Sequence, residues 1–307
     1  MNKQNHKGEI GYTNNGHYKM TIVDYINNRN VTIEFEDGSQ KTVTYQRFRQ
    51  GEVSFENRYN NQIFPCVNGG YVKIIERKKG NPYCLVEFDN VPIQRGYVYY
   101  GNLAKGLVKN PWQPSICNIG YIGKIFDQNN PITKNVAYTH WSHMIRRCYD
   151  SKHHKYRFYG AKGVKVCKEW LCFANYEKWF NNNYYEIPNC DMIVDKDILY
   201  KNCKLYSPTT CSIIPSDINK LFCNAKAIRG QLPLGVTYHK INHNYIATIT
   251  KCNKRIHLGC FNTPQEAFRA YKIAKEQYIK EMADKYREYL PQKIYDAMYN
   301  YQVDITD

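Results

Sequence analysis

Residues 191–219 read DMIVDKDILYKNCKLYSPTTCSIIPSDIN, and this stretch decides the fold at the centre of the chain. The apolar run at 192–194 predicts a β-strand that delivers Asp-Lys-Asp at 195–197. A polar, turn-rich loop follows, and the apolar pair at 213–214 predicts a second short strand. A helix is predicted to begin at Asp217. The predicted order is therefore strand, loop, strand, helix.

This layout resembles the ββα-metal core of HNH endonucleases, in the homing-like form found in phage proteins. In that family a strand ends in an acid beside a His, a loop carries an Asn, and the helix returns a His or Asn. The resemblance implies that Asp195 and Asn219 bind Mg²⁺ or Mn²⁺ through oxygen atoms, the ligands that such cations prefer. It also implies that Asp195, Lys196, Asn202 and Asn219 are the catalytic residues of an enzyme that hydrolyses DNA phosphodiester bonds.

Lys196 departs from the family, which has its general-base His at this position. A lysine acts as a base only where its pKa falls far below about 10.4, and the neighbouring acids Asp195 and Asp197 oppose such a fall. His153 or His154 is an alternative base, and Lys196 would then clamp the scissile phosphate. The second interpretation is a DNA-binding or regulatory protein whose nuclease fold is inactive. The third is a platform for a protein partner, with Asp-Lys-Asp an ordinary solvated turn.

Composition favours a nucleic-acid partner. The chain of 307 residues carries 43 Lys and Arg against 27 Asp and Glu, a formal net charge of +16 that points to a polyanionic partner, most commonly nucleic acid, with an anionic membrane as the rival. The resemblance to DNA-cleaving enzymes implies that this partner is double-stranded DNA. No apolar run approaches the roughly 18 residues of a membrane span, and the N-terminus lacks the apolar core of a signal peptide. We therefore expect a cytoplasmic protein without a membrane partner, in the host cytoplasm if a phage encodes it. The twelve cysteines include no CxxC pair and are expected to be free thiols.

The N-terminal third contains an internal repeat, with units at 1–58 and 59–115. Ile33-Glu-Phe-Glu in the first unit corresponds to Val86-Glu-Phe-Asp in the second. Apolar residues at every second position from Val31 predict half-buried strands, so each unit should form a bent antiparallel sheet or a small barrel-like fold. Such modules bind nucleic acid, a protein partner or a neighbouring domain, and the sequence leaves these alternatives open.

The HNH-like domain is predicted to span 132–224 and to begin with a helix. Trp141, Met144, Ile145 and Cys148 recur at helical spacing and predict its buried face. Basic residues of this helix and of the loop after it are candidates for contacts with DNA phosphates, with a solvated surface as the alternative. These residues are Arg146, Arg147, Lys152, Lys155 and Arg157.

Residues 231–289 resemble the APETALA2/ethylene-response-factor DNA-binding domain, which also occurs fused to phage nucleases. The resemblance rests on Gly235-Val236, Leu258-Gly259 and Glu266-Ala267 through Tyr271, and a capping box at Thr263 predicts the start of its helix. It implies three strands and one helix, with a sheet face that contacts DNA. The residues aligned with the contact positions are Lys240, Tyr245, Thr248, Thr250, Arg255 and His257. A protein-binding module is the alternative, and 290–307 is predicted to be a short helix and tail. The whole chain is thus predicted to be an α+β multidomain protein.

Overall fold

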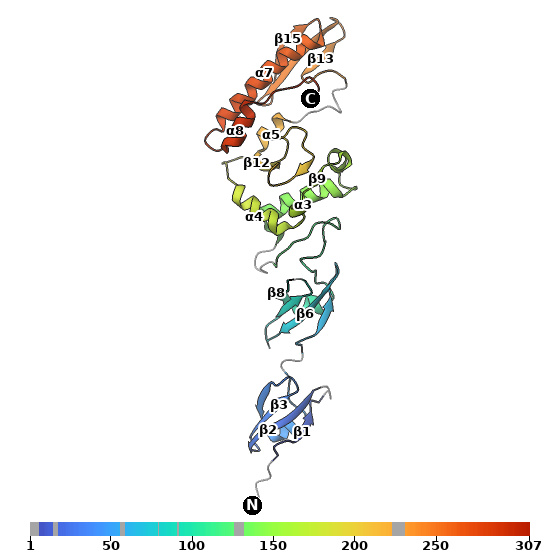
Figure 1. Ribbon diagram of the computed structural model, residues 1–307, viewed down its shortest axis with the longest axis vertical. Coiled ribbons are helices and arrows are strands. Elements are labelled where there is room, and N and C mark those ends of the chain that lie inside the picture. Colours follow the sequence, from blue (N-terminus) through green and yellow to red (C-terminus); the bar gives the residue numbers. More distant parts are fainter. Residues whose placement is uncertain are drawn as a thin grey trace, which may run out of the picture. The chain divides into compact units, whose positions relative to one another are not determined.

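The computed structural model describes residues 6–14, 18–55, 59–78, 80–90, 92–125, 132–222 and 231–307. The chain has the mixed α+β architecture that the sequence predicts, built from several small sheets (Figure 1). It divides into two compact units, residues 1–113 and 114–307. The predicted domain boundaries at 58 and 224 lie outside the described residues.

The first unit contains the same strand order twice, as the internal repeat predicts. The first copy consists of β1 (Ile10–Tyr12), β2 (Lys19–Asn27), β3 (Asn30–Phe35), β4 (Gln40–Val43) and α1 (Tyr45–Arg49). The second consists of β5 (Ile63–Pro65), β6 (Tyr71–Glu76), β7 (Tyr83–Phe88), β8 (Gln94–Tyr99) and α2 (Tyr100–Ala104). In both copies the four strands pair antiparallel in chain order. Neither sheet closes into a barrel within the described ranges, so the bent-sheet alternative is the one observed.

Alternation of apolar residues produces the buried face of each sheet. Val31, Ile33 and Phe35 are buried along β3, as their two-residue period predicts. The equivalent positions of β7, including Val86, are buried in the same way. The side chains between them, such as Glu34, stay partly exposed because successive residues of a strand point to opposite faces.

The second unit begins with several helices and one short strand, which precede the predicted strand–loop–strand–helix stretch and share its hydrophobic core. Its first elements are η1 (Ile132–Lys134), α3 (Val136–Tyr149), η2 (Tyr156–Phe158), η3 (Gly160–Lys162), β9 (Lys165–Val166), η4 (Lys168–Leu171) and α4 (Phe173–Asn183). Then follow β10 (Met192–Asp195), β11 (Leu205–Tyr206), β12 (Ser212–Pro215) and α5 (Ser216–Leu221). β10 pairs antiparallel with β12, and α5 starts directly after it. The parallel pair of β11 with β9 was not predicted.

The unit ends in a three-stranded antiparallel sheet covered by a long helix, as the resemblance implies. The elements are β13 (Val236–His239), β14 (Asn244–Lys251), β15 (Lys254–Phe261), α7 (Pro264–Lys285) and α8 (Gln292–Tyr299). α7 lies along one face of the sheet (Figure 1). Its capping box is confirmed, since the Thr263 hydroxyl accepts from the Glu266 amide and the Glu266 carboxylate accepts from the Thr263 amide.

One hydrophobic core runs through the second unit. The predicted face of α3 is buried, and Trp141 donates a 2.6 Å hydrogen bond from Nε1 to the Trp170 carbonyl oxygen. The same core includes residues of the C-terminal sheet and of α7, such as Ala247 and Ile279. The ring of Phe222 also packs edge-on against Tyr301. The C-terminal module therefore shares buried surface with the preceding part of the unit, residues 132–222.

No helix in the described part of the chain combines the length and the apolarity that crossing a bilayer requires. The cysteines of the described ranges are free thiols, as the sequence predicts. Burial raises the pKa of Cys211 to about 12, so this thiol stays protonated at neutral pH.

Candidate functional site

The four residues proposed for catalysis line a single cavity of about 330 Å³. Asp195 reaches it from the end of β10, and Lys196 from the next position. Asn202 lies on the loop after β10, and Asn219 lies on α5. The antiparallel β10–β12 pair followed at once by α5 is what brings these positions together.

Asp195 is almost fully buried, with 9% of its surface exposed. Its Oδ2 accepts hydrogen bonds from the backbone N–H groups of Asp197 and Ile198, both at 2.8 Å. These bonds close the turn after β10 and fix the orientation of the carboxylate. Burial raises the pKa of Asp195, and the two backbone hydrogen bonds partly offset that rise. The other oxygen, Oδ1, accepts no hydrogen bond from the described residues.

Lys196 is held in an ion pair with its neighbour. Its ammonium lies 2.8 and 2.7 Å from the two carboxylate oxygens of Asp197 and 5.8 Å from the centre of the Tyr206 ring. The Lys196 side chain is 7% exposed and the Asp197 side chain 41% exposed. The ammonium donates to both carboxylate oxygens, and this two-point contact holds the lysine side chain against Asp197. This arrangement disfavours Lys196 as a general base.

The two asparagines differ in their backbone geometry. Asn202 is exposed and has φ of 60°, a left-handed conformation that Asn tolerates better than most residues. The loop thus has a conformational reason for an Asn at this position. Asn219 is half-buried within α5 and has ordinary helical geometry.

The donor chemistry of the cavity fits a hard divalent cation. Asp195 contributes one carboxylate oxygen that accepts no hydrogen bond within the described ranges, and Asn202 and Asn219 contribute amide oxygens to the lining of the same cavity. In metal sites, hydrogen bonds to a ligating side chain hold it in the orientation that the metal requires. The two backbone hydrogen bonds to Asp195 would do this for its carboxylate. Within the described ranges no three His, Cys, Asp or Glu side chains lie close enough to share a metal ion.

Three lysines of this cavity were missed by the sequence analysis. Lys162, Lys201 and Lys204 line it together with the aromatic residues Tyr159 and Tyr301. Lys201 and Lys204 flank Asn202 in the sequence KNCK, a local signal that could have identified them. Lys162 comes from η3, and only the fold brings it near. Lys201 also forms an ion pair with Asp307.

The basic residues predicted around α3 fall into two groups. Arg146, Lys152, Lys155 and Arg157 are exposed and able to contact a phosphate. Arg147 is half-buried, with its guanidinium carbon 4.9 Å from the centre of the Tyr159 ring and 4.8 Å from that of Tyr206. Its Nε is fully buried and has no hydrogen-bond partner among the described residues. His153 and His154, the alternative bases, do not line the cavity.

The C-terminal sheet gathers most of its predicted DNA contacts on one face. The register places Thr248 opposite His257 and Thr250 opposite Arg255. The guanidinium of Arg255 donates to the Thr248 hydroxyl at 3.3 Å, and all four side chains remain partly or fully exposed. These residues therefore form a continuous polar surface.

The remaining two predicted contacts lie elsewhere on the C-terminal module. Tyr245 has the same strand parity as the buried Ala247 and Ile249, and it packs against the core. Its ring lies 5.2 Å from that of Tyr238 on the neighbouring strand. Lys240 is exposed in the turn after β13. Four of the six predicted contact residues of the C-terminal module therefore lie on the polar face of the sheet, and two do not.

Comparison of the chain with protein-family models, curated proteins and solved structures finds no match.

Proposed function

We propose that this protein binds double-stranded DNA and hydrolyses its phosphodiester bonds with the help of Mg²⁺ or Mn²⁺. The observation that carries the proposal is the convergence of Asp195, Asn202 and Asn219 on one cavity, at the junction of two strands and a helix. The net charge of +16 and the polar face of the C-terminal sheet support a DNA substrate. The activity corresponds to that of the HNH family.

Each residue has a defined role in this proposal. Asp195 and Asn219 would hold the cation, and Asn202 is a further amide donor on the same cavity. The cation, when bound, stabilises negative charge on the phosphate and the leaving oxygen. Lys162 and Lys204, which line the cavity, would bind phosphates of the substrate and displace their counterions. The Lys196–Asp197 ion pair, which has no net charge, would hold the Lys196 side chain in place at the wall of the cavity.

A second candidate function is DNA binding without cleavage. The observation that favours it is that position 196, where the HNH family has its general-base His, carries a Lys that is held in an ion pair with Asp197. In this case the cavity retains the nuclease geometry but does not activate water. The N-terminal repeats are open to either a nucleic-acid or a protein partner in both candidate functions.

Cleavage of supercoiled plasmid in the presence of Mg²⁺ or Mn²⁺ distinguishes the two functions. The wild-type protein should nick or linearise the plasmid only with metal, and Asp195→Asn should abolish cleavage while DNA binding persists. Glu186→Gln is the matched control, since Glu186 is exposed and its substitution changes the net charge equally. Tight binding without any metal-dependent cleavage by the wild-type protein would refute the nuclease and support the second function.

A further inference from the structure

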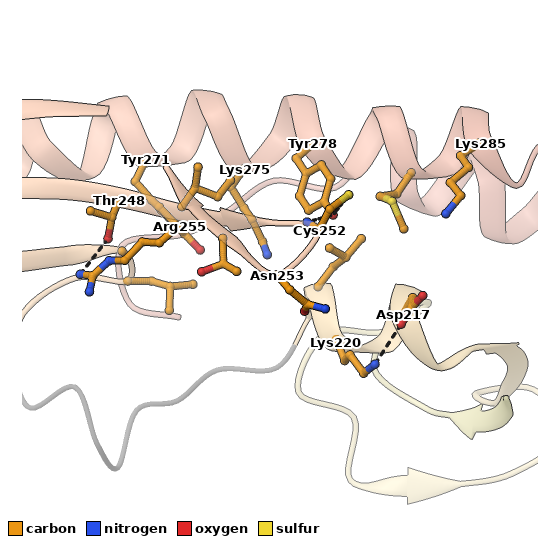
Figure 2. A pocket seen from close by; sticks show the side chains of 16 residues that line it. Asp217, Lys220, Thr248, Cys252, Asn253, Arg255, Tyr271, Lys275, Tyr278 and Lys285 are labelled. Carbon is orange, nitrogen blue, oxygen red and sulfur yellow. Dashed lines mark hydrogen bonds and ion pairs between the residues drawn. The ribbon is translucent and has the colours of Figure 1, made fainter. Parts of the chain in front are cut away.

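A second cavity lies on the other side of α5, at the edge of the C-terminal sheet. It has a volume of about 590 Å³ and is bounded by α5, by β14 and by α7 (Figure 2). β13 pairs only with residues 244–247 of β14, whereas β15 pairs with residues 245–251. Among the residues that the structure describes, no strand therefore pairs with the edge of β14 beyond Thr248 on the β13 side, and the cavity opens there.

The charges around this groove are mainly positive. Lys220 reaches it from α5, Arg255 from β15, and Lys275 and Lys285 from α7 (Figure 2). Asp217 is the one acidic residue among the described residues that line it. Asp217 pairs with Lys220 at 2.9 Å, but both side chains are more than half exposed, so the pair contributes little and Lys220 can exchange partners.

The groove also adjoins the polar face of the sheet. Thr248, Thr250 and Arg255 belong both to that face and to the lining of the groove. Of the five N–H donors of Arg255, one is directed to Thr248. A guanidinium with donors to spare, next to hydroxyl groups and ammonium groups, matches the oxygens of a phosphodiester.

α5 separates the groove from the Asp195 cavity. Asp217, Lys220 and Leu221 line the groove, whereas Asn219 and the adjoining Phe222 line the cavity. A helix is about 10–12 Å across with its side chains, and one DNA strand advances about 3.4 Å per nucleotide. The two sites are therefore about three nucleotides apart, a spacing that one DNA backbone can bridge.

We propose that the groove between α5 and the β14 edge binds the DNA phosphate backbone and so fixes the position of the duplex relative to the Asp195 cavity. This inference rests on the proposed DNA-binding function. Lys220 and Lys285 would contact phosphates directly, and Arg255 would connect the groove to the face of the sheet. The segment of duplex on the sheet would thereby be held at a set distance from the bond that is cut.

The test is the salt dependence of binding to a 30-base-pair duplex, measured by fluorescence anisotropy on the full chain. Each phosphate contact adds about 0.9 to the slope of log affinity against log salt, or about eightfold in affinity at 0.1 M relative to 1 M salt. The double variant Lys220→Gln/Lys285→Gln should reduce the slope by about 1.8 and the affinity at 0.1 M salt at least tenfold. Asp217→Asn, which removes the acid of the groove, should bind the duplex more tightly than the wild-type protein.

The matched control is Lys178→Gln/Lys293→Gln, which removes two exposed lysines of α4 and α8 outside the groove. A groove variant that binds like this control, while the wild-type protein binds with a steep salt slope, would overturn the groove and leave the proposed function intact. A wild-type protein without measurable DNA binding would overturn both. Unchanged tryptophan fluorescence of each variant confirms that its fold is preserved.

Discussion

The ion pair of Lys196 with Asp197 predicts that two substitutions of adjacent residues have very different effects. The pair is asymmetric, because the Lys196 side chain is 7% exposed and the Asp197 side chain 41% exposed. Asp197→Asn leaves a buried ammonium without its counterion. Lys196→Met leaves a carboxylate that water can solvate. We expect the first substitution to be strongly destabilising and the second to be nearly neutral.

The magnitude follows from the contacts of Lys196. Removal of one partner from a buried ion pair costs about 3–5 kcal/mol. The amide oxygen of Asn at position 197 can still accept one hydrogen bond, which returns about 1 kcal/mol. The expected loss for Asp197→Asn is therefore about 2–4 kcal/mol. The contact of Lys196 with the Tyr206 ring persists in this variant and does not change the difference. For Lys196→Met the change should stay within about 1 kcal/mol, since a hydrophobic side chain of similar length fills the same space.

Urea unfolding of the second unit, followed by tryptophan fluorescence, measures the difference in stability between the two variants. Trp141 and Trp170 are fully buried in its core, so their emission reports its unfolding. A loss of 2–4 kcal/mol corresponds to a fall in Tm of roughly 4–16 °C for a unit of this size. Equal effects of the two substitutions, or a larger loss for Lys196→Met, would refute the assignment of the ammonium as the buried, dependent partner.

Two further predictions concern other parts of the second unit. Burial raises the pKa of Asp195 above its ordinary 3.8, so the native state binds this proton more tightly than the unfolded state does. The contribution of Asp195 to the free energy of unfolding therefore falls as pH rises from about 3.8 through the native pKa. Urea unfolding at a series of pH values should therefore show Asp195→Asn gaining stability relative to the wild type across that window, and a constant difference would contradict the raised pKa. Gly235→Ala should destabilise by about 2–5 kcal/mol, because φ is 76° and a Cβ would lie 2.0 Å from the Tyr271 ring. Gly163→Ala is the control, because φ is 80° and nothing lies within 4 Å of the added Cβ, so this variant should lose only the backbone cost of about 1–2 kcal/mol. Equal losses of stability in the two variants would show that the contact with the Tyr271 ring does not contribute to the effect of Gly235→Ala.

Local patterns were sufficient for most of the secondary structure. The stripe of α3 and the capping box of α7 depend on residues three or four positions apart, so the sequence contains the complete signal. Local patterns also predicted the strands β10 and β12 and the start of α5, with bounds within two residues of those observed. The two-residue strand β11 was not, because its parallel partner β9 precedes it by about forty positions and two residues show no periodicity.

The candidate site was only partly accessible from the sequence. The resemblance placed Asp195, Asn202 and Asn219 in one site, and the structure brings them to one cavity. The orientation of Lys196 towards Asp197 was not predicted, because a side-chain rotamer depends on the burial around it. Lys162 was missed because η3 reaches the cavity through tertiary packing alone.

Tyr206 shows why the net charge of the chain overstates the charge that is available for DNA. The ring of this buried residue is approached by two cations, with the guanidinium of Arg147 at 4.8 Å and the ammonium of Lys196 at 5.8 Å from its centre. The face of an aromatic ring attracts cations, and such contacts are stronger when they are shielded from water. Both cations are thereby committed to the fold. Lys162 and Lys204 of the cavity and Lys285 of the groove, by contrast, are exposed at the walls of these openings. The proposed attraction for DNA therefore depends on where the basic side chains end, and the salt slope of binding should be smaller than the count of basic residues suggests.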